Sequence, residues 1–187
     1  GQTTAETQLS GKAVETAKKN GEPVKAPVEV EATRNSNTAP VVNIEVPKSA
    51  GETKVEIPVT NVKPGTVAVL VHPDGTEEII KNSVSTEDGI QLTVNGGATV
   101  KIVDNSKDFI DTREHWSRDQ VNFVAARELF QGVGNNQFGV GHPMTRGMVN
   151  TVLARLAGVD TTSAAGQNWY DKGVAWAREN GVSDGTN

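Results

Sequence analysis

The chain has 187 residues, which is enough for one large domain or two small ones. Its net charge of −5 excludes the broad basic face with which a nucleic-acid-binding protein neutralises phosphates. The absence of cysteine excludes disulfides, thiolate zinc sites and a cysteine nucleophile. No apolar run approaches the ~20 residues that a spanning helix needs, so we expect no membrane insertion.

The composition changes sharply near residues 105–107. All eight aromatic residues lie after residue 107. The first 107 positions hold ten lysines and one arginine, whereas the remainder holds one lysine and six arginines. We therefore predict one domain at residues 1–107 and a second at residues 108–187.

The first domain opens with a weak helical pattern and continues with strands. Leu9, Ala13 and Ala17 recur at helical spacing, and Asn20-Gly21 supplies a stop signal. Apolar residues then alternate with polar ones, which predicts about seven short strands, at residues 28–32, 42–46, 55–59, 67–71, 78–81, 90–94 and 99–103.

Two turn sequences and the absence of aromatics define the type of domain. Residues 73–76 and 95–97 are rich in Gly, Asn and Asp, which suits tight hairpin turns. Only Val, Ile and Leu are available to fill the core, and no aromatic face is available for a sugar or a base. We predict a small β sandwich or roll with one N-terminal helix, acting as a spacer or structural domain.

The second domain is predicted to be helical. An amphipathic helix follows Trp116, ends at Gly132 in the left-handed conformation, and has its apolar stripe at Val121, Val124, Ala125 and Leu129. A glycine-rich loop at residues 132–141 then leads to Thr145, the expected N-cap of a second helix that ends at Gly158. The apolar residues of this second helix are Met148, Val149, Val152, Leu153 and Leu156.

The pattern then begins again. Aligning Trp169 with Trp116 gives a period of 53 residues without gaps, so residues 161–187 correspond to a second, truncated copy of residues 108–160. A helical hairpin of this size cannot bury its apolar stripe alone. We therefore expect an exposed apolar face, covered either by the β domain or by another copy of the chain.

The ordered elements of the second domain resemble the S-layer homology (SLH) motif. These elements are Asp108-Phe109-Ile110-Asp111, His115-Trp116, the first helix, Gly132, Phe138 and Pro143-Met144-Thr145-Arg146. The resemblance implies an α+β multidomain chain in which a mainly β domain precedes an all-α SLH-type repeat region, with one complete and one truncated motif. It also implies an exported protein of a Gram-positive (Firmicutes) bacterium.

What the family does is implied by the same resemblance. Typically three SLH motifs form a pseudo-threefold bundle that binds a secondary cell-wall polysaccharide, often a pyruvylated one, without covalent attachment. Two stretches depart from the motif. Gly147-Met148 follows Arg146 where the motif has Ala-Glu, so a capping box is lost and the helix start is loosened. Glu128 stands where the motif has a glycine, which the second copy retains as Gly181.

Arg146 is the leading candidate for ligand binding. An arginine at a helix start lies beside unpaired N–H groups, and its planar fork matches a carboxylate such as a pyruvyl ketal. The alternative is a structural ion pair with Asp111, Glu114 or Asp119. Thr145, as the cap of this helix, belongs to the same candidate site.

The other candidate ligand residues are Trp116, Trp169, Asp111 and Gly132. Either indole could pack on a sugar ring or fill the core between repeats, and for Trp116 the spacing favours the core. Gly132 would let a ligand approach the backbone. We expect core positions for Phe123, Phe138 and Trp176.

No catalytic or metal-binding pattern stands out in the sequence. It lacks the G-x-S-x-G and H-E-x-x-H motifs, and its three histidines are far apart. We expect no catalysis, no metal and no cofactor. The chain opens on Gly1 without a signal peptide, and we expect any export signal to have been removed before that residue.

The predicted function is non-catalytic anchoring of a secreted protein at the cell wall or S-layer surface. The expected partner is an anionic cell-wall polysaccharide. Two alternatives remain. The region could be a structural self-assembly module without glycan binding, or the anchor of a larger exported enzyme. Self-association could complete the truncated repeat bundle.

Overall fold

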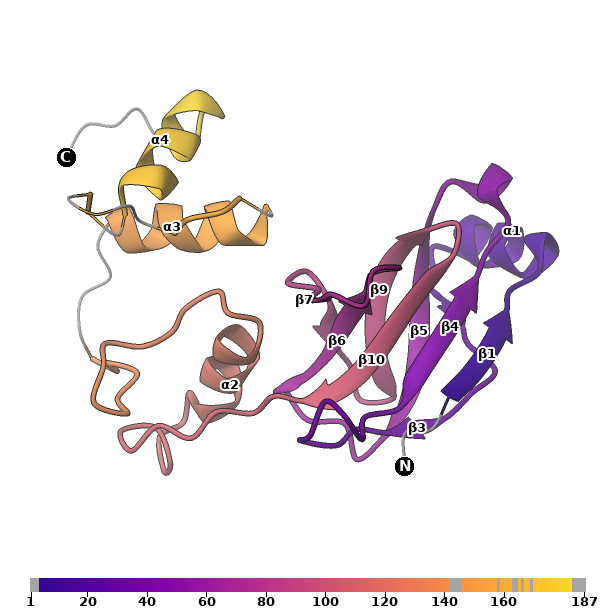
Figure 1. Ribbon diagram of the computed structural model, residues 1–187, viewed down its shortest axis with the longest axis horizontal. Coiled ribbons are helices and arrows are strands. Elements are labelled where there is room, and N and C mark those ends of the chain that lie inside the picture. Colours follow the sequence, from indigo (N-terminus) through magenta and orange to yellow (C-terminus); the bar gives the residue numbers. More distant parts are fainter. Residues whose placement is uncertain are drawn as a thin grey trace. The chain divides into compact units, whose positions relative to one another are not determined.

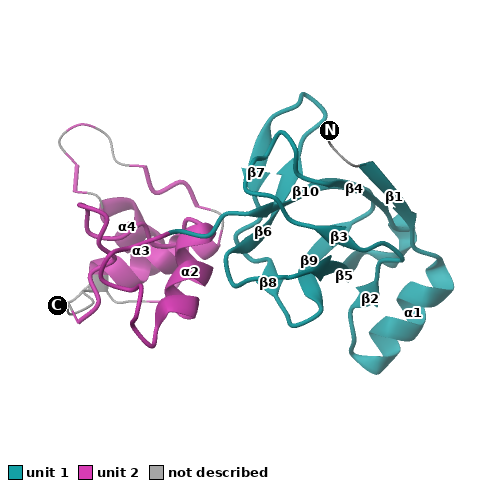
Figure 2. Cartoon of the chain, turned by 90° about the horizontal axis from the view of Figure 1, so that it is seen from below, with its two compact units in different colours: residues 1–107 teal, residues 108–187 magenta. Residues whose placement is uncertain are grey.

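A computed structural model describes residues 4–141, 146–157, 159–162, 165, 167–168 and 170–182, without the side chain of Arg146. The chain divides into two units, which are coloured separately in Figure 2. Unit 1 comprises residues 1–107 and unit 2 comprises residues 108–187. Each unit is described by itself below.

Unit 1 is mainly β and contains two sheets (Figure 1). The elements are β1 (Thr4–Gln8), α1 (Gly11–Asn20), β2 (Val24–Lys25), β3 (Val30–Glu31), β4 (Val41–Glu45), the 3₁₀ helix η1 (Lys48–Ala50), β5 (Glu52–Thr60), β6 (Thr66–Val71), β7 (Glu77–Ile79), β8 (Val84–Ser85), β9 (Gly89–Asn95) and β10 (Ala98–Asp104). One sheet has the strand order β1-β4-β10-β6-β7, and the other has the order β2-β5-β9-β8, with β3 also paired to β5.

A single aliphatic core joins the two sheets. Val42 and Ile44 of β4 and Val55 and Ile57 of β5 are at most 1% exposed and belong to one buried cluster. Strand alternation places these side chains on the inner faces, and burial of such apolar area is the main driving force for folding. The sheets therefore pack as the two layers of a sandwich.

The start of unit 1 differs from the prediction. A strand, β1, precedes the helix, and Ala13 is exposed rather than buried. The Ser10 hydroxyl accepts the Ala13 N–H at 3.1 Å, so the helix begins at Gly11 and buries Val14 instead. The predicted stop is confirmed, because Gly21 takes the left-handed conformation at φ +69°.

The strand count and one turn were also predicted wrongly. Unit 1 has ten strands in its described part rather than about seven. Residues 73–76 do form a hairpin turn, between the antiparallel strands β6 and β7. Residues 95–97 do not, because β9 pairs with β5 and β8 whereas β10 pairs with β4 and β6. A turn sequence reverses the chain, but packing of the sandwich decides which sheet receives the next strand.

Unit 2 has three helices in its described part, namely α2 (Arg118–Ala126), α3 (Arg146–Leu156) and α4 (Asp171–Glu179). Each end of α4 lies 53 residues after the corresponding end of α2. The two helices also end alike. The Leu129 N–H donates to the Val124 carbonyl at 3.0 Å, and the Val182 N–H donates to the Ala177 carbonyl at 2.8 Å. The period found in the sequence thus recurs in helix bounds and caps.

The first helix of unit 2 ends earlier than predicted. The left-handed residue at the end of α2 is Glu128, with φ +57°; Gly132 also has a positive φ, of +89°, but lies four residues further along the loop. Residues 127–141 then form a long loop, so the described part of unit 2 is not all-α. Thr145 and Gly158, the predicted limits of the next helix, lie outside the described residues.

The third helix, α3, buries a different face from the predicted stripe. Asn150, Thr151 and Ala154 are buried, whereas Val149 and Leu156 are 40% and 46% exposed. The reason is that α4 packs against the Thr151 side, where a Cβ added to Gly173 would lie 2.7 Å from the Thr151 Cα. Among the described residues, no helix combines the length and apolar character needed to cross a bilayer.

Candidate functional site

The loop between α2 and α3 contains a tight turn. Asn135 and Asn136 both have positive φ, at 52° and 56°, and the Gln137 N–H donates to the Gly134 carbonyl at 2.9 Å. Positive φ at both central residues is the geometry of a type I′ turn, in which asparagine and glycine are favoured. The Asn135-Asn136 sequence is therefore explained by the conformation of this turn.

An aromatic cluster holds this loop. The Phe138 ring makes edge-to-face contacts with Phe130, at a centroid distance of 4.8 Å, and with Phe109, at 5.5 Å. Gly132 has φ +89°, and a Cβ there would lie 2.6 Å from the Gln137 carbonyl oxygen. Gly132 is thus required by loop packing. Its role in admitting a ligand stays a prediction.

The Asp111 carboxylate accepts hydrogen bonds from the later part of the loop, at residues 138–140. Its Oδ1 accepts the Phe138 N–H at 2.8 Å, and its Oδ2 accepts the N–H groups of Gly139 at 2.8 Å and Val140 at 3.3 Å. The bond from the Phe138 N–H is the main reason that the pKa of Asp111 lies below its usual 3.8, and the other two amides act in the same direction against partial desolvation. Asp111 therefore remains ionised and ties residues 108–112 to the loop.

Arg146 is the first residue of α3, only five positions after Gly141. The side chain of Arg146, and the whole of Thr145 and Trp169, lie outside the described residues. The structure brings Asp111 and Gly132 together around one loop and places Arg146 at the start of the helix that follows this loop in the sequence. The assignment of these residues to a ligand stays a prediction.

Trp116 is 83% exposed, so the favoured prediction of a core position is wrong. The His115 ring lies beside it, with a centroid distance of 5.4 Å. The Ser117 N–H donates to His115 Nδ1 at 3.2 Å, just before α2 begins at Arg118. The His-Trp pair therefore forms the turn that starts α2 and leaves the indole in solvent. Phe123, Phe138 and Trp176, predicted as core residues, are half-buried.

Two arginines that were not predicted to matter organise unit 2. The Arg127 side chain is fully buried, its Cζ lies 3.8 Å from the Phe123 ring centroid, and its Nη1 donates to the Phe123 carbonyl at 3.1 Å. Burial lowers the pKa of Arg127 to about 10. Arg155 Nη1, on α3, donates to the Leu129 carbonyl at 3.1 Å, which links α3 to the end of α2. Only the i, i+4 spacing of Phe123 and Arg127 could have signalled the first contact.

An aromatic side chain packs against the first turn of α3. A Cβ added to Gly147 would lie 3.0 Å from both Cβ and Cγ of Tyr170. The absence of a side chain at Gly147, which directly follows Arg146 in the sequence, therefore leaves room for Tyr170 beside the start of α3. That this glycine loosens the helix start stays a prediction, and the structure shows that it also has a packing role.

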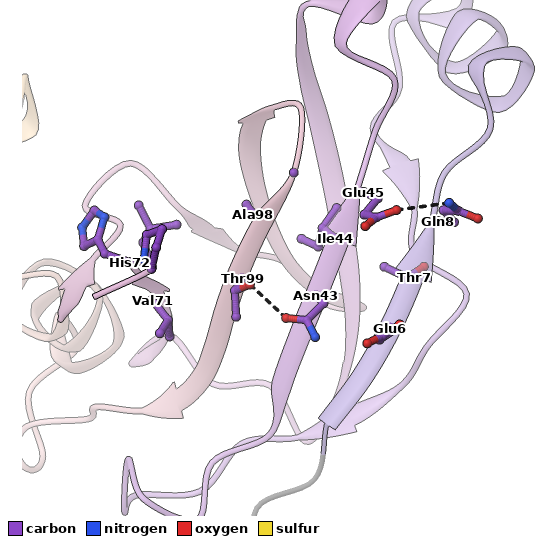
Figure 3. A pocket seen from close by; sticks show the side chains of 13 residues that line it. Glu6, Thr7, Gln8, Asn43, Ile44, Glu45, Val71, His72, Ala98 and Thr99 are labelled. Carbon is purple, nitrogen blue, oxygen red and sulfur yellow. Dashed lines mark hydrogen bonds between the residues drawn. The ribbon is translucent and has the colours of Figure 1, made fainter. Parts of the chain in front are cut away.

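Unit 1 contains an open groove of about 750 Å³ on the outer face of the β1-β4-β10-β6 strands (Figure 3). Thr99 Oγ1 donates to Asn43 Oδ1 at 2.9 Å, and Gln8 Nε2 donates to Glu45 Oε2 at 3.1 Å. The described residues that line it include Glu6 and Glu45 but no lysine, arginine, phenylalanine, tyrosine or tryptophan. The groove therefore suits neither an anionic polymer nor stacking on a sugar.

Residues 108–147 match the family model of the S-layer homology domain. The match begins at Asp108, contains the Asp111-bound loop and ends in the first turn of α3. It supports an SLH domain protein, and an SLH domain implies a non-catalytic cell-surface anchoring module that binds cell-wall polymers. Searches of the curated proteins and of the solved structures returned no match to the chain.

Proposed function

We propose that unit 2 anchors a secreted protein of a Gram-positive, Firmicutes bacterium to an anionic secondary cell-wall polysaccharide, with Arg146 as the main contact. The observation that carries the proposal is that the SLH match ends where α3 begins, at Arg146 and Gly147. The first N–H groups of a helix have no intrahelical partner and carry partial positive charge. An arginine there makes a local anion site within a chain of net charge −5.

The chemistry favours a carboxylate on the glycan, such as a pyruvyl ketal. Guanidinium and carboxylate groups match in a bidentate geometry, which adds orientation to charge attraction. Thr145 would cap the helix, and the exposed Trp116 indole offers a face for a sugar ring. Trp169 would occupy the equivalent position in the second copy.

The second proposal within this function concerns the repeat. The bounds of α2 and α4 are offset by the same 53 residues at both ends, and the two helices end with the same hydrogen bond. Both observations support the interpretation of residues 161–187 as part of a second SLH motif. Several motifs on one chain would raise the overall affinity without new contacts in each site.

Binding can be tested by co-sedimentation of the full chain with purified cell-wall sacculi. We expect the wild-type chain to sediment with intact sacculi. With sacculi that have been stripped of their secondary polymer by hydrofluoric acid, we expect it to stay in the supernatant. Arg146→Ala should weaken binding by roughly 1.5–3 kcal/mol, the range of a charged hydrogen bond. The matched control is Arg178→Ala, which removes an exposed arginine from α4.

The proposal fails if the wild-type chain binds intact and stripped sacculi equally, or if both arginine variants bind equally well. Trp fluorescence during urea unfolding reports on unit 2 alone, because all three tryptophans lie after residue 107. An unchanged unfolding midpoint would show that a loss of binding by Arg146→Ala is not a loss of fold.

A second candidate function is self-assembly. Among the described residues of the α3–α4 region, four large apolar side chains are exposed, namely Val149, Leu156, Tyr170 and Val182, at 40%, 46%, 37% and 48%. Isolated exposed apolar residues are common, but four in one small helical region favour an additional contact surface. Sedimentation equilibrium separates the candidates, since stable oligomers without sacculus binding would favour self-assembly over anchoring.

A further inference from the structure

We propose that Asp111 is a positioning residue for glycan binding, which fixes the loop that leads into α3 and thereby the place of Arg146, and does not itself touch the glycan. This inference rests on the proposed function of unit 2. It is carried by the three backbone N–H groups, from Phe138, Gly139 and Val140, that converge on one carboxylate.

The 108–112 segment holds the loop at two further points. The Ile110 N–H donates to the Asn136 carbonyl at 2.9 Å, and the Phe109 ring packs on Phe138 with centroids 5.5 Å apart. The carboxylate extends this hold beyond Phe138 to Val140, toward α3. Without it, the described contacts of the segment with the loop would end at Phe138.

The other end of α3 is fixed independently. Arg155 Nη1 donates to the Leu129 carbonyl at 3.1 Å, and Arg155 Nε donates to Thr161 Oγ1 at 3.0 Å. Five residue steps separate Gly141 from Arg146, which limits the distance between their Cα atoms to about 18 Å. The C-terminal half of α3 is thus tethered to the end of α2, and Val140, the last residue that Asp111 binds, lies six positions before Arg146.

The same geometry argues against direct contact between Asp111 and the glycan. Both carboxylate oxygens already accept N–H bonds at 2.8 Å. A carboxylate would also repel the anionic polymer that the proposed function requires. The convergent amides form a small anion site, and the protein fills that site with its own side chain.

The test uses the full chain and the sacculi described above as the probe. Asp111→Asn keeps the shape of the side chain but turns an N–H₂ group toward backbone donors, so at least one of the three bonds is lost. Asp108→Asn is the matched control, because it removes a carboxylate three residues away that is bound by Arg113 at 2.7 Å and not by the loop.

We expect Asp111→Asn to weaken sacculus binding at least about tenfold and Asp108→Asn to change it less than about twofold. Amide exchange at Phe138, Gly139 and Val140 should be faster in Asp111→Asn only. The double variant Asp111→Asn/Arg146→Ala should bind no more weakly than Arg146→Ala alone, because a residue that acts through Arg146 has no effect once Arg146 is absent. A general loss of structure would instead add to the effect of Arg146→Ala.

Wild-type binding of Asp111→Asn, with faster exchange of the three amides, would overturn the inference and leave the proposed function intact. Additive losses in the double variant would overturn it as well. Failure of the wild-type chain to bind sacculi would instead overturn the proposed function. If Asp111→Asn lowers the unfolding midpoint of unit 2, the binding test is repeated with Asp111→Glu, which keeps the charge. The longer carboxylate must displace the loop, and unchanged binding with shifted loop amide resonances would again refute the positioning role.

Discussion

Replacing Glu128 by glycine should stabilise unit 2. Glu128 has φ +57° at the end of α2, whereas the equivalent position after α4 is Gly181, with φ +69°. Both positions lie within the same pattern of capping hydrogen bonds. A side chain in the left-handed region costs roughly 1–2 kcal/mol because its Cβ crowds the following carbonyl, and glycine avoids this cost.

The charge of Glu128 contributes two smaller effects of opposite sign. Its attraction to Arg155 is favourable and acts against the lowering of the Arg155 pKa by burial. Its negative charge near the C-terminus of α2 is unfavourable, because the helix dipole is negative there, and each effect amounts to a few tenths of a kcal/mol. The net expectation for Glu128→Gly is a gain of about 1 kcal/mol, which corresponds to roughly 4–8 °C in Tm for a unit of this size.

Tryptophan fluorescence in urea is the appropriate assay, because unit 1 contains no aromatic residue and remains silent. Glu128→Gln removes the charge but keeps the backbone cost, so it should lie within about 0.5 kcal/mol of wild type. Gly181→Ala should produce the reverse effect, a loss of about 1 kcal/mol. The reasoning is refuted if Glu128→Gly is no more stable than Glu128→Gln, or if Gly181→Ala costs nothing.

Four further predictions address packing, exposure and pH. Gly173→Ala should destabilise unit 2 by about 1–3 kcal/mol in urea unfolding, because the added Cβ would lie 2.7 Å from the Thr151 Cα. An unfolding midpoint equal to that of the wild-type chain would contradict the close crossing of α3 and α4. Arg127→Ala removes a fully buried side chain and should cost about 3 kcal/mol in the same assay, and a change below about 1 kcal/mol would contradict that burial. Trp116→Ala should stay within about 0.5 kcal/mol of wild type by circular dichroism melting, since the indole is 83% exposed, and a larger loss would show that it belongs to the core. The pKa of Asp111 is lowered in the folded chain, so the carboxylate stabilises the loop fully at pH values above 3.8, and this stabilisation is lost as the pH falls below that value. Amide exchange at residues 138–140 measures this loss, and a loss of protection already at about pH 5 would contradict the prediction.

Sequence periodicity was sufficient for the local features of this protein. The alternation of Val42, Ile44 and Val46 with polar residues predicted a strand with one buried face, because strand side chains alternate regardless of what they pack against. Gly21 ended α1 as predicted, since its left-handed conformation is a local requirement. The 53-residue period likewise predicted the matching bounds of α2 and α4.

Contacts between distant residues were decided only by the tertiary structure. The carboxylate of Asp111 meets amides 27 to 29 positions away, and no local pattern records such a contact. The sequence alone determined strands, helices and turns, because these depend on neighbours within a few residues. The tertiary structure decided which sheet received β10, why Trp116 lies in solvent and which acid holds the loop before α3, because each of these depends on the packing of segments far apart in the chain.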